Sequence, residues 1–134
     1  MTMAGSATPE LTDDDLRQRV SVLEEGIVVW DEVSHPTERA AEVMGDELAR
    51  LVAPIGDYGL LIDLTGAGRP TASVRAMLRA HFGRVPAAHA AAFTGQNMLL
   101  NAMAYFVLGG VGHASYSVHR GRSEALDAIR RVRG

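Results

Sequence analysis

The spacing of apolar residues along the chain changes between the period of a strand and the period of a helix. Two runs rich in β-branched residues, 19–23 and 27–33, are separated by Glu24, Glu25 and Gly26. This is a turn sequence in which the glycine can adopt a positive φ. We therefore predict a β-hairpin at the start of the folded region.

Helical spacing follows the hairpin and then alternates with short apolar runs. Between Thr37 and Pro54 the apolar residues recur every three or four positions, with acidic residues on the other side, which predicts a helix. Thr71 and Ser123 begin two later segments as capping residues. We predict helices over 70–82, 98–108 and 123–132, and strands over 59–65, 87–93 and 114–119.

The predicted element order is β-β-α-β-α-β-α-β-α. Strands that alternate with helices after an opening hairpin indicate the α/β class, with one mixed sheet and helices packed on it. The chain has 134 residues, the size of one domain, which we place at residues 17–134. Residues 1–16 are polar and acidic, and we expect them to form a flexible tail.

Three stretches within residues 17–133 resemble the STAS, or SpoIIAA-like, family, which includes bacterial anti-anti-sigma factors. Residues 60–65 resemble the family's central strand, residues 71–74 lie where its signature loop enters the next helix, and residues 123–126 resemble its closing helix. The resemblance implies a SpoIIAA-like fold and a non-catalytic interaction or regulatory module. The Asp-Ser-Ser-Gly motif, whose serine is phosphorylated in anti-anti-sigma factors, is absent. The chain is therefore similar to the branch without this motif, which has been compared with lipid-binding Sec14-type (CRAL-TRIO) domains.

Composition excludes several classes of chemistry. The chain has no cysteine, and all 13 of its basic residues are arginine. Disulfides, thiol nucleophiles, iron–sulfur clusters, Schiff-base lysines and P-loop lysines are therefore excluded. Aromatic residues make up only 5%, so we expect no nucleic-acid partner. Because we find neither a long apolar stretch nor a signal peptide, we expect no stable membrane insertion and a cytoplasmic location.

Charge is distributed unevenly between the two halves of the chain. Residues 1–67 contain 14 acidic residues and 4 arginines, whereas residues 68–134 contain 2 acidic residues and 9 arginines. Either a basic surface attracts an anionic partner, or two sides of the molecule carry opposite charges exposed to solvent.

Polar side chains follow the predicted strands at their carboxyl ends, where α/β sheets bind ligands. Two hydroxyl residues also begin a predicted helix, whose N-terminus favours a phosphate group. The candidates for binding a ligand or phosphate are Asp63, Thr65, Arg69, Thr71, Ser73, Thr94 and Asn97. The alternative is that these side chains cap helices and satisfy loop amides.

Histidines give no metal motif in this sequence. No pair of the five has a ligand spacing typical of a helix, so we predict neither a metal site nor a cofactor. His81 falls on an apolar helix face and is predicted to lie in the core, while His113 and His119 could share a strand face. Because no catalytic set is assembled, a small enzyme acting through Asp63 is only a second alternative.

The predicted helix over 98–108 is apolar on all sides, with Asn101 its one strongly polar residue. Such a helix must bury its second face against a partner copy, an apolar ligand, or the neighbouring helix and tail. We predict a homodimer, or contact with another protein, through this helix. The interface would comprise Met98, Ala102, Met103, Tyr105 and Phe106. A small apolar ligand or lipid bound beneath the helix is the first alternative.

Overall fold

The computed structural model describes residues 11–109, 111, 113 and 115–133, and the side chains of these except 98, 99, 102, 106 and 133. Its strands are β1 (Val20–Glu24), β2 (Ile27–Asp31), β3 (Gly59–Asp63), β4 (His89–Phe93) and β5 (Tyr116–His119). Its helices are α1 (Asp13–Gln18), α2 (Glu38–Val52), α3 (Ala72–Arg84), α4 (Met98–Leu108) and α5 (Arg122–Arg133). The predicted α/β class is confirmed.

The strands form one mixed sheet in the order β1-β2-β3-β4-β5. The hairpin pairs β1 with β2 antiparallel around Gly26, whose φ is +79°, and each later strand pairs parallel with the strand before it. Each β–α–β crossover therefore moves the chain one strand along the sheet. The predicted single mixed sheet is also confirmed, although Ala114, in the predicted last strand, lies outside the described residues.

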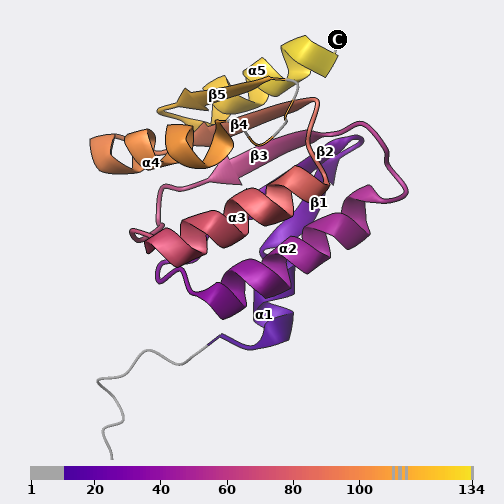
Figure 1. Cartoon of the computed structure of the whole chain (residues 1–134). Helices are drawn as coiled ribbons and strands as arrows, with labels where there is room; N and C mark the ends of the chain where they lie inside the picture. The colour runs from indigo at the N-terminus through magenta and orange to yellow at the C-terminus, as the bar shows by residue number, and fades with distance from the viewer. Residues whose placement is uncertain (1–10, 110, 112, 114, 134) are drawn as a thin grey trace, which may run out of the picture.

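Helices cover both faces of this sheet. Figure 1 shows α2, α3 and α4 on one face, whereas α5 lies on the other. Side chains of each strand alternate between these layers: Val28 and Trp30 join the core beneath α2 and α3, while Val29 and Leu61 pack against α5. Trp30 is fully buried and meets the ring of Phe82 edge-on, with the ring centroids 5.0 Å apart.

The prediction of a flexible tail over residues 1–16 is wrong for its last residues, which begin helix α1. Thr12 and Asp15 form a capping box: Thr12 Oγ1 accepts from Asp15 N–H at 3.1 Å, and Asp15 Oδ2 accepts from Thr12 N–H at 3.0 Å. Leu16 is 1% exposed and belongs to the main core. One cap and one buried leucine hold this short helix, which shows no repeating apolar pattern. Residues 1–10 of the predicted tail lie outside the described residues.

Ion pairs join the acidic first half of the chain to the basic second half. Arg130 of α5 reaches Glu24 at the end of β1, with Nη2 2.6 Å from Oε1.

In the described part of the chain, none of the helices combines the length and the apolar character that a membrane span requires.

Candidate functional site

An apolar pocket opens near the carboxyl ends of β2, β3 and β4, between α3 and α4. Trp30, Ile62 and Ala92 supply its floor from the sheet, and Phe82 supplies a ring from α3. The space that water-sized groups can occupy is about 40 Å³, within a hollow of about 500 Å³ that includes open solvent. The pocket therefore lies where open α/β sheets bind ligands.

Helix α4 forms one wall of this pocket, which accounts for much of its apolar character. Leu100, Ala104, Val107 and Leu108 are buried and line the pocket, and Met103 lies there half-buried. Tyr105 does not line the pocket and is 48% exposed. Three residues of the predicted interface, Met98, Ala102 and Phe106, have side chains outside the described residues.

Glu32 places a single carboxyl group in the apolar wall. Its side chain lines the pocket and the residue is 7% exposed. Oε1 accepts from the backbone N–H of Val33 at 2.9 Å, and Oε2 accepts from Trp30 Nε1–H at 3.4 Å. Burial raises the pKa of Glu32, since it disfavours the ionised form. Such a carboxyl can accept a hydrogen bond from a ligand or, when protonated, donate one.

The sequence pattern did not mark Glu32 as a candidate. It follows the apolar strand β2 directly, and charged residues at strand ends usually face water. The one sequence feature that could have indicated a buried Glu32 is its position inside the apolar run 27–33, between Trp30 and Val33.

The loops that carry Asp63, Thr65 and Thr94 lie side by side at the carboxyl ends of β3 and β4, where Leu64 N–H donates to the carbonyl oxygen of Phe93 at 3.0 Å. Asp63 Oδ1 accepts from Thr65 N–H at 2.9 Å and from Thr65 Oγ1–H at 2.7 Å, which fixes the turn after β3. Thr94 is 4% exposed, and its backbone N–H donates to the carbonyl oxygen of His119. Asn97 Oδ1 accepts from Leu100 N–H at 3.1 Å at the start of α4. These contacts organise loops and a helix end.

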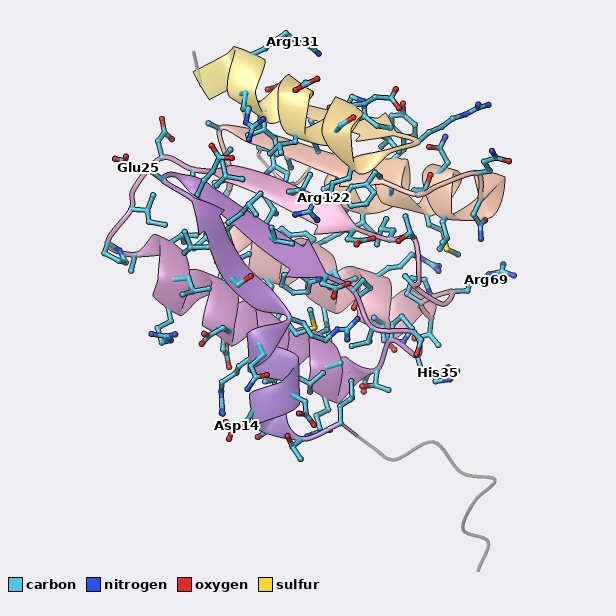
Figure 2. All side chains as sticks on the ribbon, turned by 180° about the vertical axis from the view of Figure 1, so that it is seen from behind. Asp14, Glu25, His35, Arg69, Arg122 and Arg131 are labelled. Carbon is cyan, nitrogen blue, oxygen red and sulfur yellow. The ribbon has the colours of Figure 1, made fainter. Side chains whose placement is uncertain are left out.

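The predicted phosphate residues lie separately at the start of α3. Thr71 is its N-cap, with Oγ1 accepting from Val74 N–H at 3.3 Å and lying 3.1 Å from Ser73 Oγ. Figure 2 shows Arg69 pointing away from the body of the molecule rather than toward this helix end. The arrangement is the capping one that the sequence offered as the alternative.

His81 lies in the core between α2 and α3, as predicted. It is 4% exposed, and its Nε2 lies 3.1 Å from Glu42 Oε2. Arg84 Nη2 lies 2.6 Å from His81 Nδ1, so Nδ1 accepts and Nε2–H donates to Glu42. One ligand atom from each of His81, Glu42 and Asp46 falls within 4.8 Å of the others, a grouping that could hold a metal ion. The Arg84 guanidinium already places a positive charge beside these three side chains.

The expectation that His113 and His119 share a face is wrong. His113 packs beside Phe82 of α3, with ring centroids 6.1 Å apart, and its Nδ1 accepts from Ala87 N–H at 2.9 Å. His119 instead pairs in register with Phe93, which faces α5. His113 precedes β5, so the alternation of the strand does not extend to it. The structure brings His119 close to His89, a grouping that the sequence did not reveal.

Comparison of the sequence with models of protein families finds no matching family, and comparison with curated proteins finds no match either.

Proposed function

We propose that this protein is a cytoplasmic small-ligand-binding module of STAS or SpoIIAA-like type. In this proposal the apolar end of a small amphipathic molecule, such as a lipid, enters the pocket between α3 and α4. The single observation that carries the proposal is an apolar pocket whose wall contains one buried carboxyl group, Glu32. Pockets of this composition bind by apolar burial and select their ligand with a few polar groups.

The dimensions of the pocket limit what can enter it. A space of about 40 Å³ is comparable to roughly three water-sized groups. A few carbon atoms of the ligand therefore lie inside, and the remainder occupies the mouth between α4 and the loop at Gly68 and Pro70. A hydroxyl or amide N–H near the apolar end would bond to Glu32.

The same site provides its own spectroscopic reporter, because Trp30 is the one tryptophan of the chain and lines the pocket. We expect the emission of Trp30 to change saturably when 1-hexanol, a short chain with a terminal hydroxyl, is titrated into the protein. Ala104→Leu fills the pocket and should weaken binding at least tenfold. Ala80→Leu, the same change on an exposed position of α3, should not.

Two results would contradict the proposal. One is wild-type emission that does not respond to the alcohol. The other is unchanged affinity in Ala104→Leu, provided that its thermal unfolding remains cooperative. Native mass spectrometry of the purified protein adds an independent measurement, since a bound lipid would appear as an added mass that Ala104→Leu lacks.

A second candidate function is self-association through α4, favoured by an exposed aromatic pair. Tyr105 of α4 is 48% exposed and Tyr116 of β5 is 40% exposed, and their rings meet edge-on with centroids 6.3 Å apart. Aromatic residues of this kind are enriched in protein interfaces. Light scattering should then give a dimer for the wild type and a monomer for Tyr105→Glu, with exposed Val22→Glu as control. A monomeric wild type contradicts this candidate.

A further inference from the structure

Two histidines and two serines form a hydrogen-bonded chain on the α5 face of the sheet, away from the apolar pocket. The register pairs Ala91 with Ser117 and Phe93 with His119 across β4 and β5. Ala91 and Phe93 pack in the α5 layer, so Ser117 and His119 project on that side. His89 lies two residues before Ala91 and shares its face.

The distances within this chain are those of good hydrogen bonds. Ser117 Oγ lies between two imidazoles, 2.7 Å from Nε2 of His89 and 2.6 Å from Nε2 of His119. On the other side of its ring, His89 Nδ1 lies 2.7 Å from Ser115 Oγ. Ser115 Oγ–H donates in turn to the carbonyl oxygen of Ala88 at 3.2 Å.

One arrangement of the protons satisfies every contact in this chain. Because Ser115 uses its hydrogen on the Ala88 carbonyl, its Oγ accepts from His89 Nδ1–H. The Nε2 of His89 then carries a lone pair and accepts from Ser117 Oγ–H. Ser117 Oγ accepts in its turn from His119 Nε2–H. His89 is thus placed to take a proton from Ser117, as a general base is.

His89 is also kept in its neutral form. It is 5% exposed, and burial lowers its pKa, with the neighbouring His119 and Arg131 adding to the effect. Figure 2 shows Arg131 near the carboxyl end of α5. A neutral imidazole beside a hydroxyl, oriented on its far side by a third group, is the arrangement that activates serine nucleophiles.

We propose that Ser117 is a nucleophile that accepts acyl groups from activated esters or thioesters, with His89 as the general base and Ser115 as a positioning residue. Ser117 Oγ forms a bond to the acyl carbon while its proton passes to His89 Nε2. The bond between the acyl carbon and the leaving oxygen or sulfur breaks, and the leaving group receives the proton from His89. The product is an O-acyl serine on β5.

Ser117 is reachable for such a donor. Ser117 and His119 are both partly exposed. They lie on β5, which is the last strand of the sheet in the described part of the chain. An acyl donor therefore approaches from the sheet edge, without entering the pocket beneath α4.

The test uses the wild-type protein and p-nitrophenyl acetate near neutral pH. We expect release of about one equivalent of p-nitrophenolate per chain in a first rapid phase. Intact mass should show one added acetyl group, and peptide mapping should place it on Ser117. An acetyl group found elsewhere, or none at all, overturns the proposal without the need for any variant.

Variants then assign the roles. His89→Gln should slow acetylation of Ser117 by about 100-fold or more, the range for loss of a general base. Exposed Ser123→Ala is the matched control and should leave the rate unchanged. Ser115→Ala should slow the reaction, and Ser115→Thr, which keeps the hydroxyl, should restore it. Acetylation of Ser117 at the wild-type rate in a folded His89→Gln protein overturns the proposal.

Discussion

The imidazole ring of His81 lies directly against the backbone of Gly45, so that helices α2 and α3 touch at a position where a side chain has no room. A Cβ atom built on Gly45 would overlap the ring atoms of His81. The ring is 4% exposed and is held from both sides by Glu42 and Arg84. The close approach of the two helices therefore depends on this glycine.

We predict that Gly45→Ala destabilises the fold, although alanine is the better helix former. In an exposed helix the change would stabilise by about 1 kcal/mol. Here overpacking against a held, buried ring outweighs that gain, and we expect a net loss of about 2 kcal/mol. Urea unfolding followed by Trp30 fluorescence measures the difference.

Two comparisons make this prediction specific. A Cβ at Gly66 meets no atom within 4 Å, so Gly66→Ala should leave stability nearly unchanged. Combining Gly45→Ala with His81→Ala should recover stability relative to the sum of the single changes, since the clash is removed. Strictly additive effects would contradict the proposed contact.

Thr71 should act as a helix cap. Its hydroxyl accepts from Val74 N–H, so Thr71→Ala should lower the free energy of unfolding by about 1 kcal/mol. Thr71→Asp should preserve stability, because aspartate is also a good cap and favours the helix N-terminus. Ser73 lies two residues after Thr71, and Ser73→Ala should change stability by less than about 0.5 kcal/mol. Equal stability of Thr71→Ala and the wild type would argue against the capping role.

His113 should make the protein acid-sensitive. Burial lowers the pKa of His113 to about 4 from 6.5. Its Nε2 is buried and finds no hydrogen-bond partner within the described part of the chain. In the unfolded chain His113 therefore binds a proton at a higher pH than in the folded protein. The free energy of unfolding decreases as pH falls from about 6.5 to about 4. The free-energy change is on the order of 3 kcal/mol.

The matched variant for this effect is His113→Gln, whose amide oxygen can still accept from Ala87 N–H but does not titrate. Its stability should decrease less than that of the wild type between pH values of about 7 and about 4.5. Parallel pH profiles for the two proteins would be inconsistent with a depressed pKa.

Glu32 should have the opposite pH dependence. Its pKa is raised above 4.5 in the folded protein, so the folded state holds a proton that the unfolded chain has released. The stabilisation that the protonated Glu32 contributes is complete at low pH. It is lost as pH rises through the raised pKa of the folded protein. Glu32→Gln does not titrate, so its stability relative to the wild type should increase as pH rises above 4.5. A constant difference would show that the carboxyl is ionised throughout.

The sequence predicted the sheet and four of the helices because their signals are local. The hairpin required only Gly26 between two β-branched runs, and each later helix showed a cap or an apolar period. Helix α1 was not predicted because its stability depends on one buried side chain, Leu16, whose partners lie far along the chain.

The functional groups were harder to predict for the same physical reason. His89 and Ser117 are 28 residues apart, and only the parallel register of β4 and β5 brings them together. Glu32 and α4 are likewise distant in sequence, so the apolar helix suggested a ligand beneath it but gave no sign of a carboxyl group in the pocket wall. By contrast, Thr71 and Asn97 could be recognised as caps because capping involves residues three positions away.

The strictly sequential order of the strands also determines how the chain can assemble during synthesis. Because β3 pairs with β2, β4 with β3 and β5 with β4, each new strand finds its neighbour already present. The paired residues are 32 positions apart for Ile27 and Gly59, and 26 apart for Ala90 and Tyr116, so each pairing must close a long loop and forms slowly. A chain emerging from the ribosome can still build the Trp30 core first. The wall that α4 adds to the pocket, and the edge strand that carries Ser117, are then added later, before α5 covers the other face.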